Sequence, residues 1–373
     1  MRSPLTLVAA ALATLVTLTP APAAAETHQP VGGERMGERG LVVAPGAPRL
    51  PRVAAAGWLI ADMDTGEVLA AKDPHGRFAP ASTMKILTAH TVMKNLAPTT
   101  MVLPTFEDVN VEGSKVGIVN RMRYSVKDLL TGMMVVSGND AANALATANG
   151  GRAATLAQMN AEAARLQAFD TRAMNPSGLD HPKQLSSPYD LALIGREAMK
   201  SQDFRRYVAT KRYYMPAPGG KRFYIATHNR LVWNYDGAIG IKNGYTVRAR
   251  ATFVGAATRN GRTLIVSLMK TNPRYWPETA ALLDWGFKAA DLGVPPVGKL
   301  VDPVDEEQPQ DVEPQAVAVA PPAAASTAEP GFDIPVVPTL LVGAGVAFLG
   351  AGVMRTRRQR RRPRSKLRLD LPL

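Results

Sequence analysis

Strand-like and helix-like patterns alternate along the middle of the chain. Apolar, β-favouring runs occur at residues 57–63, 67–71, 238–242, 251–257 and 263–269. Asp64-Thr65-Gly66 joins the first two runs, which predicts a hairpin. Arg259-Asn260-Gly261-Arg262 joins the last two, and its Asn-Gly pair favours a tight turn. The sequence therefore predicts strands at both ends of one domain.

Between these runs the apolar positions follow a helical period. The first predicted helix follows Pro80 and Ala81 and covers residues 82–94. Further helices are predicted at residues 124–136, 140–149, 155–166, 188–200 and 277–290. A sheet whose strands come from both ends of a domain, with helices inserted between them, is an α+β layout.

The first 25 residues have the pattern of a secretory signal peptide. Arg2 supplies the positive start, residues 5–18 the apolar stretch, and Ala23-Ala24-Ala25 the small residues before a cleavage point at Glu26. A membrane-spanning helix is the alternative, which Pro20 and the shortness of the apolar run disfavour. We therefore expect the chain to be exported.

A second apolar stretch lies near the other end. Residues 334–354 carry no charge, and the 19 residues of the run 336–354 nearly match the thickness of a bilayer core as a helix. An arginine-rich tail, residues 355–373, follows at once, and such a cluster stays cytoplasmic. The sequence predicts a transmembrane helix that anchors the exported body to the cytoplasmic membrane.

Two segments are predicted to be linkers. Residues 26–49 are rich in Gly, Pro and polar residues, and residues 294–333 are rich in Pro, Ala and acids. Residues 50–293 remain as a single folded domain.

Composition narrows the chemistry. The chain has no cysteine, which excludes disulfides, thiolate metal sites and cysteine nucleophiles, and no two of its five histidines have metal-ligand spacing. The net charge is +13, but the acidic segment 302–333 and the basic tail largely offset each other, so residues 26–301 are moderately basic with dispersed charges. We expect neither a metal nor a nucleic-acid partner.

Ser82 is the candidate nucleophile. Lys85 follows three residues later, on the same side of a helix, where its amine reaches the serine hydroxyl and acts as a base if its pKa is lowered. A second Ser-x-x-Lys, Ser267 to Lys270, lies in a strand pattern that places the two side chains on opposite faces. We expect a structural role for the second copy. The alternative for Ser82 is a helix cap.

Two further motifs follow in order. Ser137-Gly138-Asn139 falls in a short loop between two predicted helices, and Lys242-Asn243-Gly244 falls on a predicted edge strand. Taken alone, Ser137-Gly138-Asn139 can be explained by loop polarity and a helix cap, and Lys242-Asn243-Gly244 by a solvated lysine. Lys115-Val116-Gly117 shows that Lys-x-Gly also occurs by chance. The ordered set of three is far more specific.

This ordered set resembles that of the penicillin-recognising serine enzymes. The stretches 79–85, 136–142, 175–180 and 240–246 are more narrowly similar to the secreted serine-type D-alanyl-D-alanine carboxypeptidases, the low-molecular-weight penicillin-binding proteins. The resemblance implies a transpeptidase-like fold, an antiparallel sheet with flanking helices and a helical subdomain. It also implies peptidoglycan stem peptides as substrates, β-lactams as inhibitors, and no cofactor.

The resemblance also assigns roles. Ser82 would be the acylated nucleophile, Lys85 its base, and Ser137 the relay of the proton to the leaving D-alanine. The other residues would bind substrate: Asn139, Lys242, Asn243, Gly244, Tyr245 and Thr246. Lys242 would hold the terminal carboxylate, and the backbone N–H groups of Ser82 and Tyr245 would form the oxyanion hole.

One position departs from the family, which usually has threonine where this chain has Asn243. An amide also donates to a carboxylate, so we expect altered affinity and retained chemistry. A class A β-lactamase is one alternative, but the chain lacks the Glu-x-x-Leu-Asn run that deacylation needs. A non-catalytic wall-binding or penicillin-sensing module is the other, which intact Ser82, Lys85 and Ser137 disfavour.

Overall fold

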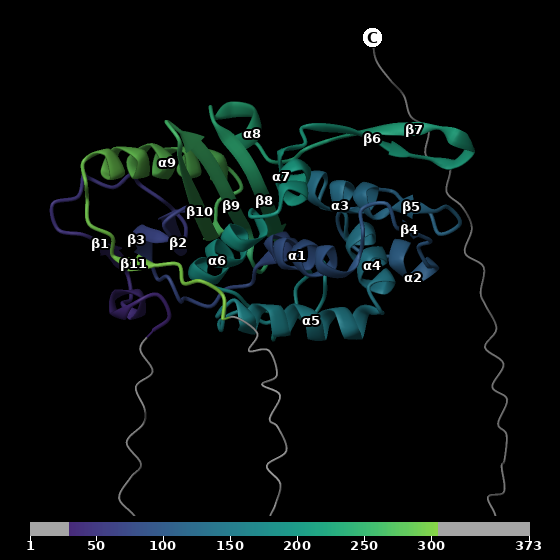
Figure 1. The fold of residues 1–373 in the computed structure, drawn as a ribbon, viewed down its shortest axis with the longest axis horizontal. Helices are drawn as coiled ribbons and strands as arrows, with labels where there is room; N and C mark the ends of the chain where they lie inside the picture. Colours follow the sequence, from purple (N-terminus) through teal and green to yellow (C-terminus); the bar gives the residue numbers. More distant parts are fainter. Residues whose placement is uncertain (1–29, 305–373) are drawn as a thin grey trace, which may run out of the picture. The chain divides into compact units, whose positions relative to one another are not determined.

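A seven-stranded antiparallel sheet organises the structure, a computed structural model that describes residues 30–304 (Figure 1). The strand order is β1-β3-β2-β10-β9-β8, and β11 also pairs with β3. The strands of this sheet are β1 (Leu41–Val43), β2 (Gly57–Asp62), β3 (Glu67–Lys72), β8 (Ala238–Thr246), β9 (Arg250–Arg259), β10 (Arg262–Thr271) and β11 (Gly298–Lys299).

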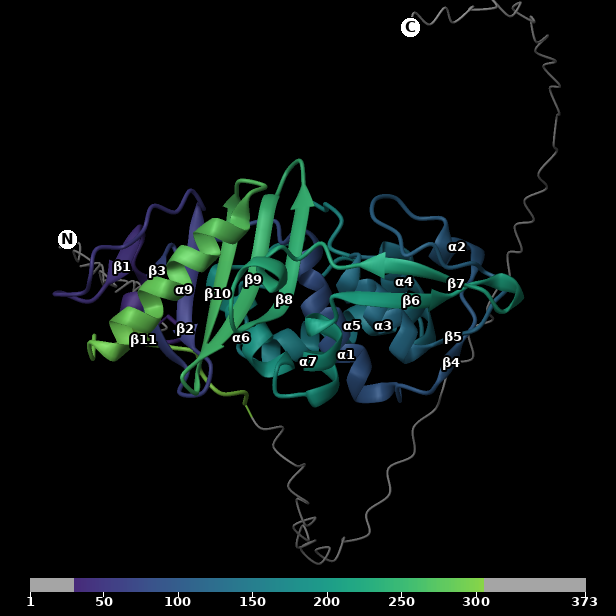
Figure 2. The ribbon, with the colours of Figure 1, turned by 90° about the horizontal axis from the view of Figure 1, so that it is seen from above.

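Helices cover both faces of this sheet. Helix α9 (Tyr275–Asp291) packs on β10 and β9 from one side, and α6 (Pro188–Ala198) packs on β10 and β2 from the other (Figures 1 and 2). All six residues of β2 are therefore buried, because both of its faces meet a helix. This two-sided burial explains why the strands read as continuous apolar runs.

A second, mainly helical region lies beside the sheet (Figure 1). Its elements, with the connecting turns, are η2 (Ala81–Met84), α1 (Lys85–Asn95), β4 (Met101–Val102), α2 (Phe106–Val109), β5 (Tyr124–Ser125), α3 (Val126–Val135), α4 (Asn139–Ala148), α5 (Arg152–Arg165) and α7 (Gln202–Ala209). The short helix η1 (Glu34–Gly37) precedes β1, and the remaining elements are β6 (Arg212–Pro216), η3 (Pro218–Gly220), β7 (Arg222–Ala226) and α8 (Leu231–Asn234).

Most sequence predictions agree with these elements. Strands β2 and β3 form the predicted hairpin, and β9 and β10 meet at the predicted Asn260-Gly261 turn. The predicted α+β class is confirmed. The predicted helix at 82–94 is partly different, because Ser82 lies in the 3₁₀ turn η2 and the α-helix begins at Lys85.

The predicted linkers are wrong in two places. Within the expected linker 26–49, β1 pairs with β3, and Met36 and Val42 are fully buried. Within the expected linker 294–333, β11 pairs with the same strand and Leu300 is fully buried. Strand β3 would otherwise have an open edge, so long-range pairing orders segments that lack a local signal.

The described residues fall within one compact unit. Among residues 30–304, no helix combines the length and the hydropathy needed to cross a bilayer. The predicted signal peptide, transmembrane run and basic tail lie outside the described residues.

Candidate active site

Ser82 lies in the 3₁₀ turn that connects the sheet region to α1. The carbonyl oxygen of Pro80 accepts hydrogen bonds from the hydroxyls of Thr83 (2.6 Å) and Thr252 (2.8 Å), which ties this turn to itself and to β9. Ala81, the residue before Ser82, has a φ of 48°, which is unfavourable for a residue with a Cβ. Such local strain is typical of functional sites, and here it fixes the half-buried Ser82 at the helix start.

Lys85 is fully buried directly beneath Ser82. Its Nζ lies 3.1 Å from Ser82 Oγ and 2.7 Å from Asn139 Oδ1, and it also donates to the carbonyl oxygen of Ser177. Two of these three partners only accept hydrogen bonds, whereas a hydroxyl also donates. A neutral amine has two N–H donors and one lone pair. With both donors used on Asn139 and Ser177, the lone pair faces the Ser82 hydroxyl.

The surroundings favour this neutral form. Burial, reinforced by the positive charge of Lys242, lowers the pKa of Lys85 well below its usual range, while the carboxylate of Asp140 opposes the shift. The lowered pKa that a base at this position requires is therefore explained by its surroundings. A neutral Lys85 can take the proton of the Ser82 hydroxyl.

The loop between α3 and α4 carries Ser137 and leads into Asn139, the first residue of α4, which contacts this lysine. Ser137 is buried and has a φ of 62°, so this loop is also strained. The amide of Asn139 is held at both ends, because Oδ1 accepts from Lys85 and Nδ2 donates to the carbonyl oxygen of Glu112 at 2.7 Å. Asn139 thus orients Lys85, a contact that the sequence analysis did not foresee.

Strand β8 borders the nucleophile on the sheet side. A Cβ at Gly244 would lie 2.7 Å from the backbone nitrogen of Ser82 and 2.6 Å from Thr252 Oγ1, so only glycine lets the strand approach this closely. The peptide between Gly244 and Tyr245 therefore lies next to the Ser82 N–H. Two backbone donors in this position could polarise the same carbonyl oxygen.

Lys242 is buried in the same strand. Among the described residues, its Nζ donates one hydrogen bond, to the carbonyl oxygen of Asn243 at 2.7 Å, and makes no ion pair. Burial lowers the pKa of Lys242 to about 7. The ammonium form keeps donors for an anionic ligand, and such a ligand would stabilise its charge.

The remaining residues expected from the sequence lie along β8. The side chain of Asn243 is half-buried, and that of Tyr245 is 60% exposed. The hydroxyl of Thr246 donates to Asp180 Oδ1 at 2.8 Å, which ties the end of β8 to the 175–180 stretch. The structure therefore brings Ser82, Lys85, Asn139 and Gly244 into contact, and leaves Tyr245 free to meet a ligand.

The second Ser-x-x-Lys is structural. Ser267 is fully buried in β10 and its hydroxyl donates to the carbonyl oxygen of Pro188 at 2.6 Å, which joins the sheet to α6. Lys270 is exposed, next to an irregularity in the strand pairing. The prediction that this copy has no pair of facing side chains is confirmed.

The carbonyl oxygen of Ser177 is the site atom that the sequence analysis missed. The side chain of Asn175 accepts from Gly178 N at 2.8 Å and from Ser177 Oγ at 3.0 Å, which shapes the loop. Gly178 has a φ of 87°, and a Cβ there would lie 1.9 Å from the carbonyl oxygen of Ala81. The 175–180 stretch is one of those that carry the family resemblance, and these contacts show that it presents the Ser177 carbonyl oxygen to Lys85.

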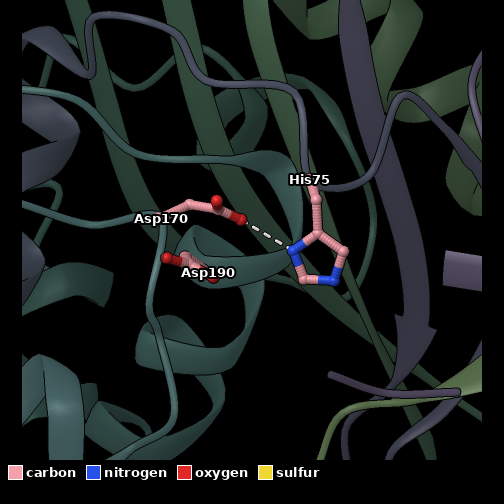
Figure 3. A group of neighbouring side chains, drawn as sticks. All are labelled: His75, Asp170 and Asp190. Atoms are coloured by element: carbon pink, nitrogen blue, oxygen red, sulfur yellow. Dashed lines mark hydrogen bonds and ion pairs between the residues drawn. The ribbon is translucent and has the colours of Figure 1, made fainter. Parts of the chain in front are cut away.

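Figure 3 shows a second group of titratable side chains, none of which is a candidate catalytic residue. Among the described residues, His75, Asp170 and Asp190 form the group whose ligand-type atoms all come within 4.8 Å of one another. His75 Nδ1 lies 2.7 Å from Asp170 Oδ2, and Arg77 Nε donates to Asp170 Oδ1 at 2.8 Å. A proton on His75 and the guanidinium of Arg77 supply positive charge to Asp170, so these contacts are explained without an ion.

Comparison with known proteins agrees with this geometry. Residues 44–272 match the family described as D-alanyl-D-alanine carboxypeptidase, peptidase family S11. The D-alanyl-D-alanine carboxypeptidase DacB2 of Mycobacterium tuberculosis is 41% identical over 249 residues, which are 65% of this chain and 85% of that protein.

Solved structures show the same similarity. A crystal structure of the D-alanyl-D-alanine carboxypeptidase from Mycobacterium tuberculosis aligns with a TM-score of 0.65 and 39% identity, over 70% of this chain and 99% of that one. The Streptomyces K15 DD-transpeptidase aligns with a TM-score of 0.62 and 30% identity, over 65% of this chain and all of that one. The family match covers more than half of the chain, so this protein belongs to the D-alanyl-D-alanine carboxypeptidases and is a serine peptidase.

Proposed function

We propose that this enzyme removes the terminal D-alanine from pentapeptide stems of peptidoglycan through an acyl-enzyme on Ser82. The observation that carries the proposal is the environment of Lys85, a fully buried amine with lowered pKa whose donors are used by Asn139 and Ser177. Its free lone pair faces Ser82 Oγ at 3.1 Å.

The first half-reaction forms an ester and releases an amine. Lys85 takes the proton of Ser82 as Oγ bonds to the carbonyl carbon of the penultimate D-alanine. The oxyanion is stabilised by the backbone N–H groups of Ser82 and Tyr245. The C–N bond then breaks, Ser137 passes its proton to the leaving nitrogen and receives the proton held by Lys85 in its place, and D-alanine departs, which leaves Lys85 neutral again.

The second half-reaction returns the enzyme to its starting state. Lys85 takes a proton from water, whose oxygen attacks the ester carbon, and Ser82 leaves with that proton. During acylation Lys242 holds the terminal carboxylate, which leaves with D-alanine, while Asn139, Asn243, Gly244, Tyr245 and Thr246 line the peptide. A β-lactam acylates Ser82 in the same way, but its leaving nitrogen stays tethered to the acyl group.

The two serines of the Ser-x-x-Lys copies provide the test. Ser82→Ala should abolish both D-alanine release and the covalent penicillin adduct that mass spectrometry detects. Ser267→Ala removes a buried hydrogen bond, which costs about 1 kcal/mol of stability, and should change neither activity. A penicillin adduct on the Ser82→Ala protein would contradict the assignment.

We also propose that the domain acts outside the cytoplasmic membrane. The signal-like segment 1–25 and the apolar run 336–354 support this location, and peptidoglycan lies outside that membrane. Protease added to intact, wall-stripped cells should release a soluble fragment that binds penicillin. A catalytic domain that stays protected until the membrane is breached would contradict this orientation.

A further inference from the structure

The hairpin β6–β7 carries an exposed face that the catalytic site does not use. Figure 1 shows the hairpin running away from the sheet along the helical region, where both of its strands pack on α3. Strand register places Tyr214 opposite Tyr224 and Pro216 opposite Arg222. Because side chains alternate along a strand, Arg212 and Tyr214 share the outer face with Tyr224 and Arg222.

The inner face of the same hairpin is fully occupied. Met215 is completely buried, and the hydroxyl of Tyr213 donates to Asp128 Oδ1 of α3 at 2.6 Å. The hairpin is therefore fixed to the helical region, and its outer face is a preformed surface.

Three aromatic rings are exposed along that surface. Tyr214 is 59% exposed, Tyr224 is 50% exposed, and their ring centroids lie 5.7 Å apart. Trp233, 38% exposed, continues the row, and Lys211 Nζ and Arg212 Cζ lie 5.3 and 5.5 Å from its ring centroid. We call these side chains, together with Arg222, the hairpin face.

The hairpin face is also positively charged without compensation. Residues 210–227 contain four basic residues, Lys211, Arg212, Lys221 and Arg222, and no acidic residue. None of the four forms an ion pair within the described part of the chain. A polyanion with flat apolar faces is complementary to this combination of rings and cations.

The hairpin face begins close to the catalytic site. After β7, the backbone nitrogen of His228 donates to the carbonyl oxygen of Val135, next to the loop that carries Ser137. Lys242 contributes to the lowered pKa of His228, after burial, which shows that its charge is felt there. A polymer that extends from the catalytic site can therefore run onto the hairpin.

We propose that the hairpin face binds a second portion of the anionic glycopeptide polymer whose stem peptide occupies the catalytic site. Pyranose rings would stack on Tyr214, Tyr224 and Trp233, and stem carboxylates would pair with Arg212 and Arg222. This inference rests on the proposed function, because it names the polymer that is the substrate. An anionic membrane is the less suitable occupant, because residues 217–220 at the hairpin tip are Ala-Pro-Gly-Gly, with no large apolar side chain to insert.

The test separates polymer binding from catalysis. Binding of the full chain to purified peptidoglycan sacculi is measured by co-sedimentation in neutral detergent, in a Ser82→Ala background that removes acylation. The variant pairs Tyr214→Ala with Tyr224→Ala, and Arg212→Glu with Arg222→Glu, should each weaken binding by about tenfold or more. The control pair Lys183→Glu with Lys288→Glu makes the same charge change on exposed residues elsewhere and should bind as the parent does.

With Ser82 present, kcat/KM for a small soluble D-alanyl-D-alanine peptide should be unchanged in both hairpin pairs. Sacculus binding equal to that of the parent would overturn the inference, as would an equal loss in the control pair. Loss of binding only to detergent micelles that contain phosphatidylglycerol would identify a membrane surface and would also overturn it. Failure of the unmodified enzyme to cleave the small peptide would instead contradict the proposed function.

Discussion

Two buried lysines act in opposite protonation states in the proposed mechanism. Lys85 must be neutral to accept a proton, whereas Lys242 must be charged to hold a carboxylate. Their mutual repulsion disfavours the doubly charged state, and the two apparent pKa values belong to the pair. The hydrogen bonds of Lys85 to Asn139 and Ser177 suit a neutral amine, which assigns the missing proton to Lys85.

The pH dependence of catalysis follows from this assignment. As pH rises, loss of the proton from Lys85 should increase kcat/KM, and loss of the proton from Lys242, whose pKa is about 7, should then decrease it. A bound carboxylate stabilises the charged form of Lys242, so the fall in kcat should occur at higher pH than the fall in kcat/KM. Steady-state kinetics between pH 5 and 9 measure both curves, and a flat kcat/KM profile would contradict the mechanism.

Asn139 provides a way to shift one limb of that profile. Asn139→Asp places a carboxylate against Lys85 Nζ, which favours the ammonium and raises the pKa of Lys85. The rising limb of kcat/KM should move to higher pH, and each unit of the shift should lower the rate on that limb about tenfold. Asn143→Asp, one turn along α4, is the matched control and should leave the limb in place. An unchanged limb in Asn139→Asp would show that Lys85 is not the titrating base.

At the scale of elements, local sequence patterns predicted the strands that flank a turn motif and the helices that have a helical period. The hairpin β2–β3 and the strands β8, β9 and β10 agree with their runs, and the paired Ser82 and Lys85 follow from spacing alone. No element is predicted for residues 202–226, which form α7, β6 and β7. Lys85 contacts Asn139, which is 54 positions away in the sequence, and Ser177, which is 92 positions away. No local sequence pattern can contain contacts over such separations.

The loop before η2 is held by a charge network whose stability depends on pH. When protonated, His75 donates from Nδ1 to Asp170 Oδ2 and from Nε2 to the carbonyl oxygen of Val31. Burial lowers the pKa of His75, but these two hydrogen bonds outweigh burial, so the pKa is raised. Burial and the nearby Asp170 raise the pKa of Asp190 to about 7, while the Thr171 hydroxyl donates to Asp190 Oδ2 at 2.7 Å.

The raised pKa values of His75 and Asp190 each contribute stability that is lost as pH rises. Each group binds a proton more tightly in the folded state, so its contribution is complete below its unfolded pKa and disappears through the folded one. The Asp170 carboxylate, with its lowered pKa, and Arg77 keep their charges over this range. The thermal unfolding temperature should therefore fall from about pH 4, near the ordinary pKa of an Asp, to about pH 7, the folded pKa of Asp190, and His75 should extend the fall above its ordinary pKa of about 6.5.

Asp190→Asn tests the share of Asp190 in that fall. The amide keeps an acceptor for Thr171 and has no charge to bury, so the decrease in stability between about pH 4 and 7 should become smaller, while stability at pH 4 and below changes little. Thermal unfolding at several pH values measures this. An identical pH dependence in Asp190→Asn and the parent would contradict it.

At the scale of the whole molecule, the outer edge of β3 decides where the domain begins and ends. Strand β1 pairs with residues 70–72 of β3, and β11 pairs with residues 67–68 on the same side. The two segments come from opposite ends of the domain and cover one edge. Without them, β3 would expose unpaired backbone groups that favour aggregation.

Fragments with different ends test this closure. A fragment of residues 50–293 lacks four large buried apolar side chains, those of Met36, Val42, Val297 and Leu300, and the hydrogen bond from Trp285 Nε1 to the carbonyl oxygen of Pro48. At about 1.5–3 kcal/mol for each buried side chain, the loss is comparable to the whole stability of a typical domain, so this fragment should be unfolded or aggregated.

A fragment of residues 30–304 keeps both segments and should unfold cooperatively and release D-alanine. Fragments 30–293 and 50–304 each retain one segment and should have intermediate unfolding temperatures, because each leaves part of the β3 edge unpaired. Thermal unfolding and D-alanine release measured on all four fragments give the comparison. Equal unfolding temperatures for 50–293 and 30–304 would show that the domain does not need the edge segments for its stability.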